Sequence, residues 1–121
     1  MANPNLVNVS TITAKSLQAA LGTTLTTEIL ANPGSSGKVF KVNNIIVANI
    51  DGSSSVDISI FITKASGSPI AIASTVSVPA DSTLIAFDKN STIYLQEGDN
   101  IEAGASAASD ATITINYEEL S

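Results

Sequence analysis

Along most of the chain, aliphatic residues alternate with Ser, Thr or Asn at every second position. This is the period of a β-strand that buries one face and exposes the other. The clearest case is the segment 111–117, whose apolar side is formed by Ala111, Ile113, Ile115 and Tyr117. We therefore expect these four side chains to lie in a hydrophobic core.

The same alternation predicts eight or nine short strands. They are Leu6–Thr13, Thr23–Ala31, Lys38–Ile50, Val56–Thr63, Pro69–Val78, Thr83–Phe87, Ile93–Leu95, Asn100–Gly104 and Ala111–Tyr117. The softer stretch Ala14–Gly22 between the first two is expected to form a short helical turn or a loop. A loop is predicted at residues 32–37, which contain Pro and two Gly, and Asp51 followed by Gly52 is a hairpin signal.

These strands predict an all-β fold, a single antiparallel β-sandwich or jelly-roll-like domain. The strands recur about every ten residues, which is typical of such folds. No long helical pattern separates them, so the crossover helices of a parallel sheet are missing. No composition break divides the chain, and one domain over residues 1–121 is expected, with 1–8 as a candidate extended arm.

The longest predicted strand carries apolar residues on both of its faces. Alternation places Phe40, Val42, Ile46, Ala48 and Ile50 on one face of Lys38–Ile50, and the other face carries Val39, Lys41, Asn43, Ile45, Val47 and Asn49. In Val56–Thr63, Val56, Ile58, Ile60 and Ile62 are expected inward and Phe61 outward. Since Ile45, Val47 and Phe61 cannot all share the core of their neighbours, either both sheet faces are covered or some of this surface meets another subunit.

The composition argues against catalysis and against several kinds of partner. There is no His, Cys, Arg or Trp, so most side chains from which active sites and soft metal sites are built are missing. The net charge of −6 would repel nucleic acid and anionic membranes. Zero Cys fits a reducing cytosol. Only 13% of the residues are charged, against about 25% in average proteins, which favours surfaces that become buried in an assembly.

Two acidic clusters are candidate sites, each with a simpler interpretation. Asp51 and Asp57 flank a Gly/Ser turn and could suggest calcium, but two carboxylates fall short of the six to eight oxygens it prefers, so a solvated hairpin is favoured. Glu97, Asp99 and Glu102 could suggest a carboxylate pair for glycoside hydrolysis. The five aromatic residues furnish a sugar cleft poorly, and a tight turn with positive φ at Gly98 is favoured. We predict no enzyme, cofactor or metal.

Five segments of the chain carry a resemblance to a known family. Ala2–Thr13, Gly37–Gly52, Ile72–Leu84, Ile93–Asp99 and Ile113–Ser121 together resemble small virion structural proteins of tailed bacteriophages, notably those of cyanobacteria and other marine bacteria. The resemblance implies a non-enzymatic decoration or cement protein that stabilises the phage head by contacts across capsomers. It implies the major capsid protein and other virion proteins as partners, and a homo-oligomer, often a trimer. It also implies the outer head surface as location, after synthesis in the host bacterial cytoplasm.

Candidate interface residues follow from these expectations. The N-terminal Ala2, Asn3, Pro4 and Asn5 are expected to reach a neighbouring subunit by strand addition, the alternative being a disordered terminus. Phe61, Glu118 and Glu119 complete the set, although an acidic tail at 118–119 is usually solvated. Two other functions stay open: a neck, tail or fibre component of the virion, and a carbohydrate- or host-surface-binding sandwich that uses an exposed aromatic such as Tyr94.

Overall fold

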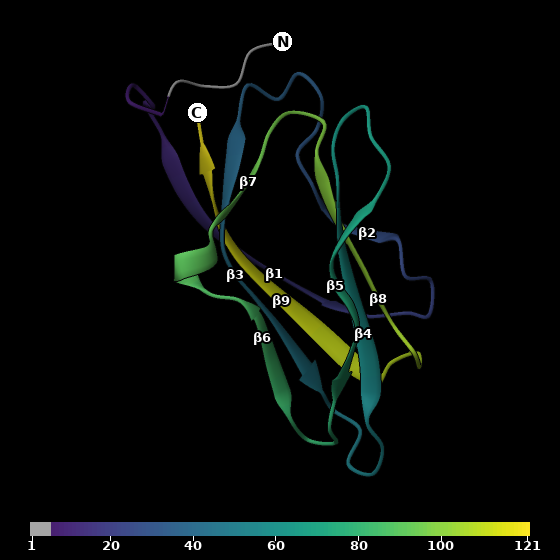
Figure 1. Cartoon of the computed structure of the whole chain (residues 1–121). Coiled ribbons are helices and arrows are strands. Elements are labelled where there is room, and N and C mark those ends of the chain that lie inside the picture. The colour runs from purple at the N-terminus through teal and green to yellow at the C-terminus, as the bar shows by residue number, and fades with distance from the viewer. Residues whose placement is uncertain (1–5) are drawn as a thin grey trace.

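The computed structural model describes residues 6–121, which form two antiparallel sheets packed face to face (Figure 1). The strands of this part of the chain are β1 (Ile12–Ala20), β2 (Thr27–Ala31), β3 (Val39–Asn49), β4 (Val56–Thr63), β5 (Ile70–Val78), β6 (Thr83–Phe87), β7 (Ile93–Leu95), β8 (Asn100–Ala105) and β9 (Ala111–Leu120). One 3-10 turn, η1 (Lys89–Ser91), separates β6 from β7. The predicted all-β class is confirmed.

The strand order is that of a jelly roll. One sheet runs β1-β9-β3-β6, with β7 also paired to β3, and the other runs β2-β8-β4-β5. The pairs β1 with β9, β2 with β8, β3 with β6 and β7, and β4 with β5 are nested around the β4–β5 turn. A long antiparallel ribbon folded over on itself gives this nesting, and it produces a two-sheet sandwich with Greek-key connections.

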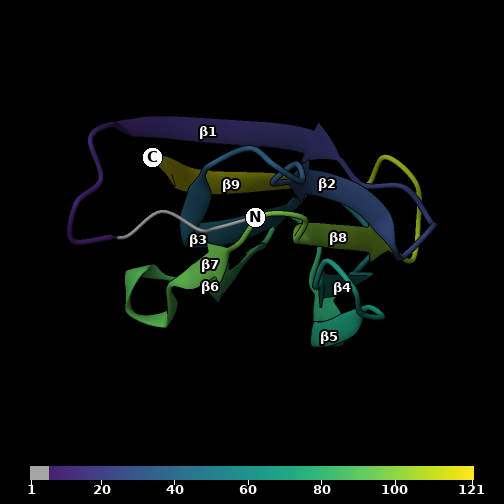
Figure 2. The same ribbon diagram turned by 90° about the horizontal axis from the view of Figure 1, so that it is seen from above.

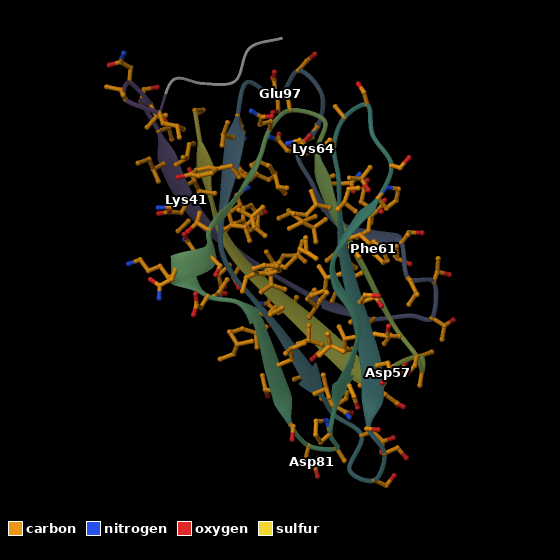
Figure 3. All side chains as sticks on the ribbon, viewed as in Figure 1. Lys41, Asp57, Phe61, Lys64, Asp81 and Glu97 are labelled. Carbon is orange, nitrogen blue, oxygen red and sulfur yellow. The ribbon has the colours of Figure 1, made fainter. Side chains whose placement is uncertain are left out.

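The inner faces of the two sheets supply one hydrophobic core. The core includes Ile58 and Ile60 of β4 together with Ile113 and Ile115 of β9 in the other sheet, and all four are fully buried. The inward faces predicted for 56–63 and 111–117 are therefore confirmed. Figure 3 shows that side chains fill the space between the two sheets.

The alternation predicted for Lys38–Ile50 holds at the start of β3 and fails beyond Val42. Phe40 and Val42 share a face, as predicted, and point inward, but the register with β9 shifts between Val42 and Asn44. This β-bulge inserts one residue, so the alternation changes phase and Ile45 and Val47 become fully buried. Ile46 and Ala48 consequently move to the outer face. Because of the bulge, β3 buries aliphatic residues from both of its alternating sets in the same core.

The N-terminal region also differs from the prediction. Residues 6–11 contain no strand, and β1 instead occupies 12–20, through the stretch expected to be a helical turn or loop. The reason is tertiary: Leu17 and Ala19 lie opposite Ile115 and Ile113 of β9 and pack against the core. Pairing with a buried strand overrides the weak local preference of this segment.

Two local expectations around the turns are also wrong. Asp51 and Gly52 do not close a hairpin, because β3 and β4 belong to different sheets and the turn carries the chain across the sandwich. The alternation predicted for Pro69–Val78 fails at Ile70, which is 64% exposed. It begins β5, whose pairing with β4 shifts register twice and which contains Thr75 at φ +48°, so simple alternation fails along this strand.

We expect Ile115→Asp to destabilise the domain by roughly 2–7 kcal/mol or more, because it would bury a carboxylate with no partner. The neighbouring Thr114→Asp, on the outer face of the same strand, should change the free energy of unfolding by less than about 1 kcal/mol. Urea denaturation of both variants measures the contrast. Equal stability would show that the facing of β9 is misassigned.

Candidate functional site

The outer face of the β1-β9-β3-β6 sheet is almost free of charge, and we call it the uncharged face. Strand register places small polar and aliphatic side chains there. They are Ala14, Ser16, Gln18 and Ala20 of β1, Thr112, Thr114 and Asn116 of β9, Asn44, Ile46 and Ala48 of β3, and Thr83 and Ile85 of β6. Ile85 is 62% exposed. Among the described residues of these strands, two charged side chains lie on the face, Lys41 and Glu118. They form one ion pair, with Lys41 Nζ 3.9 Å from Glu118 Oε1.

A shallow hollow of about 350 Å³ opens on this face between β1, β9 and β3. Ala14, Lys15 and Ser16 of β1 line one side of it, and Asn43 of β3 with Asn116, Tyr117 and Glu118 of β9 complete the lining. Asn116 Nδ2 donates to Asn44 Oδ1 at 2.7 Å, whereas the buried Oδ1 of Asn43 has no hydrogen-bond partner among residues 6–121. The hollow on the uncharged face is thus lined by amide side chains together with Lys15 and Glu118.

The outer face of the β2-β8-β4-β5 sheet has the opposite character. Its four strands contain no lysine, and Glu28 of β2 lies directly opposite Glu102 of β8. Thr63 Oγ1 donates to Glu102 Oε1 at 2.9 Å. Phe61 lies on this face, half-buried and opposite Glu102, so its predicted outward direction is confirmed (Figure 3). We call this surface the acidic face.

Glu118 and Glu119 belong to β9 rather than to an acidic tail. Glu119 points to the inner side at one end of the sandwich and is 9% exposed. Its Oε2 lies 3.1 Å from Lys15 Nζ and its Oε1 2.9 Å from Lys38 Nζ. Burial raises the pKa of this carboxyl group, but the hydrogen bonds from Lys38 and Lys15 outweigh burial and hold the pKa below its ordinary value.

The candidate carboxylate pair forms a structural turn. Asp99 is 2% exposed, and its Oδ1 accepts from Ala65 N at 3.1 Å while its Oδ2 accepts from Gln96 N at 2.8 Å and from Lys64 Nζ. Gly98 has φ +86°, as predicted for a tight turn. A carboxylate held by three donors, one of them cationic, joins the β4–β5 and β7–β8 turns, where Figure 3 labels Lys64 and Glu97.

The candidate calcium pair is also divided between different environments. Asp51 Oδ1 accepts hydrogen bonds from the backbone and hydroxyl of Ser53, both at 2.9 Å, and so stabilises its own turn. Asp57 lies in β4 on the acidic face. Residues 6–121 contain no group of three or more His, Cys, Asp or Glu that could hold a metal ion. In the same range, no helix has the length and apolar character required to cross a bilayer.

Four of the predicted interface residues, Ala2, Asn3, Pro4 and Asn5, lie outside the described residues. The uncharged face, by contrast, was not identified from the sequence as a continuous surface. Its signal was present in the low charge and in the Ser- and Thr-rich alternation, but strand order was needed to bring β1, β9 and β3 side by side. No protein-family model matches this chain, and no curated protein is significantly similar to it.

The ion pairs of Glu119 predict a pH dependence of stability. Because the pKa of Glu119 is lower in the folded than in the unfolded state, its pairs contribute stability above the ordinary value of 4.5. This contribution should be lost as the pH falls through the folded pKa. Glu119→Gln should remove this part of the acid destabilisation, measured by urea unfolding over a pH series.

A variant with both Lys15→Gln and Lys38→Gln serves as a control with the opposite sign. With the cationic donors gone, burial acts alone and raises the folded pKa of Glu119 above the unfolded one. The contribution of the Glu119 carboxyl group to the free energy of unfolding should then decrease as the pH rises through its folded pKa. Identical pH profiles for the wild type and both variants would contradict the assigned ion pairs.

Proposed function

We propose that this chain is a non-enzymatic structural protein of a tailed-phage particle, a decoration or cement protein that binds the outer head across capsomer junctions. The observation that carries the proposal is the uncharged face. It extends over four strands and offers Thr, Ser, Asn, Ala and Ile side chains with one Lys–Glu pair near one end.

Such a face suits binding to another protein. Charged residues are depleted in the cores of protein interfaces, because each charge buried there loses its hydration. Thr and Ser on a pleated surface lose little side-chain entropy when covered, compared with Lys or Glu. The major capsid protein and other virion proteins are therefore the partners we propose, contacted through the uncharged face.

The acidic face supports the outward orientation of the bound protein. With Glu28, Glu102 and Asp57 on the opposite sheet, a copy held by its uncharged face would present negative charge to solvent. Like charges on neighbouring particles repel and keep them dispersed. Many copies on one shell also let individually weak contacts sum to a large stabilisation.

The fold adds support of a different kind. Jelly rolls occur among viral capsid proteins, and the segments quoted above resemble phage virion proteins. Jelly rolls also occur among lectins, so this support is by analogy. The exposed Tyr94, 46% accessible and opposite Lys41 on the same sheet, favours carbohydrate binding as the second candidate function.

The proposal is tested on particles of the phage that encodes this chain. Immunogold labelling should place the chain on the heads of washed virions. Label confined to the neck, tail or fibres would overturn the head assignment, and a chain missing from washed particles would overturn the virion function. Glycan binding that is lost in Tyr94→Ala would favour the second candidate.

Matched variants test the face. Heads prepared without the chain should recover it when purified protein is added. Thr114→Lys, in the middle of the uncharged face, should weaken this rebinding at least about tenfold, because the new charge would be desolvated in the interface. Ser77→Lys places the same charge opposite Asp57 on the acidic face and should rebind as the wild type does. Equal rebinding of the two variants would contradict the proposed face.

A further inference from the structure

The two sheets have four edges, and three of them are interrupted. β2 is five residues long and its register shifts between Glu28 and Leu30. β5 shifts register twice and lies between Pro69 and Pro79. The edge beyond β3 is divided between β6 and β7, with η1 between them. Short strands, bulges and flanking prolines are the devices by which proteins prevent edge-to-edge pairing.

The fourth edge, β1, has none of these devices. Its nine residues pair with β9 in an unbroken register from Ile12 opposite Leu120 to Ala20 opposite Thr112. Figure 2 shows β1 along the rim of the molecule, and no other strand or 3-10 turn of residues 6–121 lies beyond it. An edge this long and regular is a template for another strand.

The hydrogen bonds at the two ends of β1 show which of its backbone groups are open. Thr11 and Ser121 exchange both backbone bonds at 3.0 Å, and Leu21 N donates to Ala111 O at 2.9 Å. Along an antiparallel strand the backbone N–H and C=O groups of successive residues point to opposite sides. Those of the odd-numbered residues of β1 therefore point toward β9. The N–H and C=O groups that point away from the sheet therefore belong to Ile12, Ala14, Ser16, Gln18 and Ala20.

The side chains of these five residues do not prevent another strand from pairing with this edge. All five are uncharged, and the side chains of Ala14, Ser16, Gln18 and Ala20 lie on the uncharged face. The one charged residue of the strand, Lys15, turns its backbone toward β9 and its side chain toward Glu119, with which it is paired. None of the five residues therefore carries a charge that would oppose pairing of this edge with another strand.

We propose that β1 pairs antiparallel with β1 of a second copy of this chain, with the two Ser16 residues facing each other on a two-fold axis. In this register Ala14 lies opposite Gln18 and Ile12 opposite Ala20. Both backbone groups of all five open residues are then hydrogen-bonded. Lys15 lies opposite Leu17 rather than opposite the second Lys15, so directly opposed like charges are avoided.

The side chains fit the same arrangement. Gln18 of the second copy lies beside Ala14, whose short side chain lines one side of the hollow on the uncharged face. The sheet becomes continuous from β6 of one copy to β6 of the other, and the two uncharged faces join into one wall. Antiparallel pairing of identical strands is a two-fold operation, so it produces a dimer rather than the trimer that the resemblance implies. The inference holds whether or not the partner of the face is a capsid.

Cysteine cross-linking tests the register, because the chain has no cysteine of its own. Ser16→Cys puts two thiols on the axis, where the Cα atoms of a hydrogen-bonded pair lie about 5.5 Å apart, within disulfide range. Ala14→Cys, on the same face of the same strand, puts the thiols four residues out of register, more than about 10 Å apart. Under mild oxidation Ser16→Cys should form a covalent dimer at least tenfold faster than Ala14→Cys. Equal rates, or no cross-linking of either variant, would overturn the proposal.

Sedimentation equilibrium at high protein concentration tests the edge without a cross-link. Ser16→Pro removes the central open N–H, which β9 does not use, and should raise the dimer dissociation constant at least about tenfold while keeping the wild-type circular dichroism. Ser16→Thr keeps the N–H and should dimerise as the wild type does. A wild type that stays monomeric, or a Ser16→Pro variant that associates equally well, would show that β1 is not the interface.

Discussion

The insertion of β9 between β1 and β3 is the interaction on which the rest of the structure depends. The last strand of the chain lies between the first strand and the third, and it contributes Ile113, Ile115 and most of Tyr117 to the core. Burying each such large side chain contributes about 1.5–3 kcal/mol. The pairing of β1 with β9 is the outermost of the nested strand pairs of the jelly roll. Contacts between the first and the last described strand therefore help to hold the inner pairs in register.

This central position of β9 also shapes the surface. From Ala111 to Asn116 the inner residues of β9 are aliphatic and its outer residues are Thr and Asn, so this part of the wall that it forms with β1 and β3 carries little charge. The bulge near Asn43 keeps this division intact, because it lets β3 bury Phe40 and Val42 before the bulge and Ile45 and Val47 after it. Without the change of phase, one pair of these residues would lie on the outer face. The proposed binding face is thus the outer surface of the same strands whose inner surface lines the core.

Buried polar residues fix how the loops connect the two sheets. Asn32 Nδ2 donates to Lys38 O and Leu95 O, while Asn49 Nδ2 donates to Ser54 O and Val78 O. Each amide satisfies carbonyl groups of two different segments, in places where water is excluded. Together with Asp99 they explain most of the buried polar side chains as supports of the scaffold. The buried amide and carboxylate groups of this scaffold therefore serve to connect its strands.

The sequence by itself determined the fold class, the approximate positions of most strands, and the inward faces of β4 and β9. These follow from a two-residue period that acts locally in each strand. Only the tertiary structure decided that residues 12–20 form a strand, that Asn43 lies at a bulge, and that Asp51 begins a crossing between sheets. A segment such as 12–20 has weak preferences of its own and takes its conformation from the buried strand beside it. The uncharged face and the open edge likewise exist only once distant strands become neighbours, which no local pattern encodes.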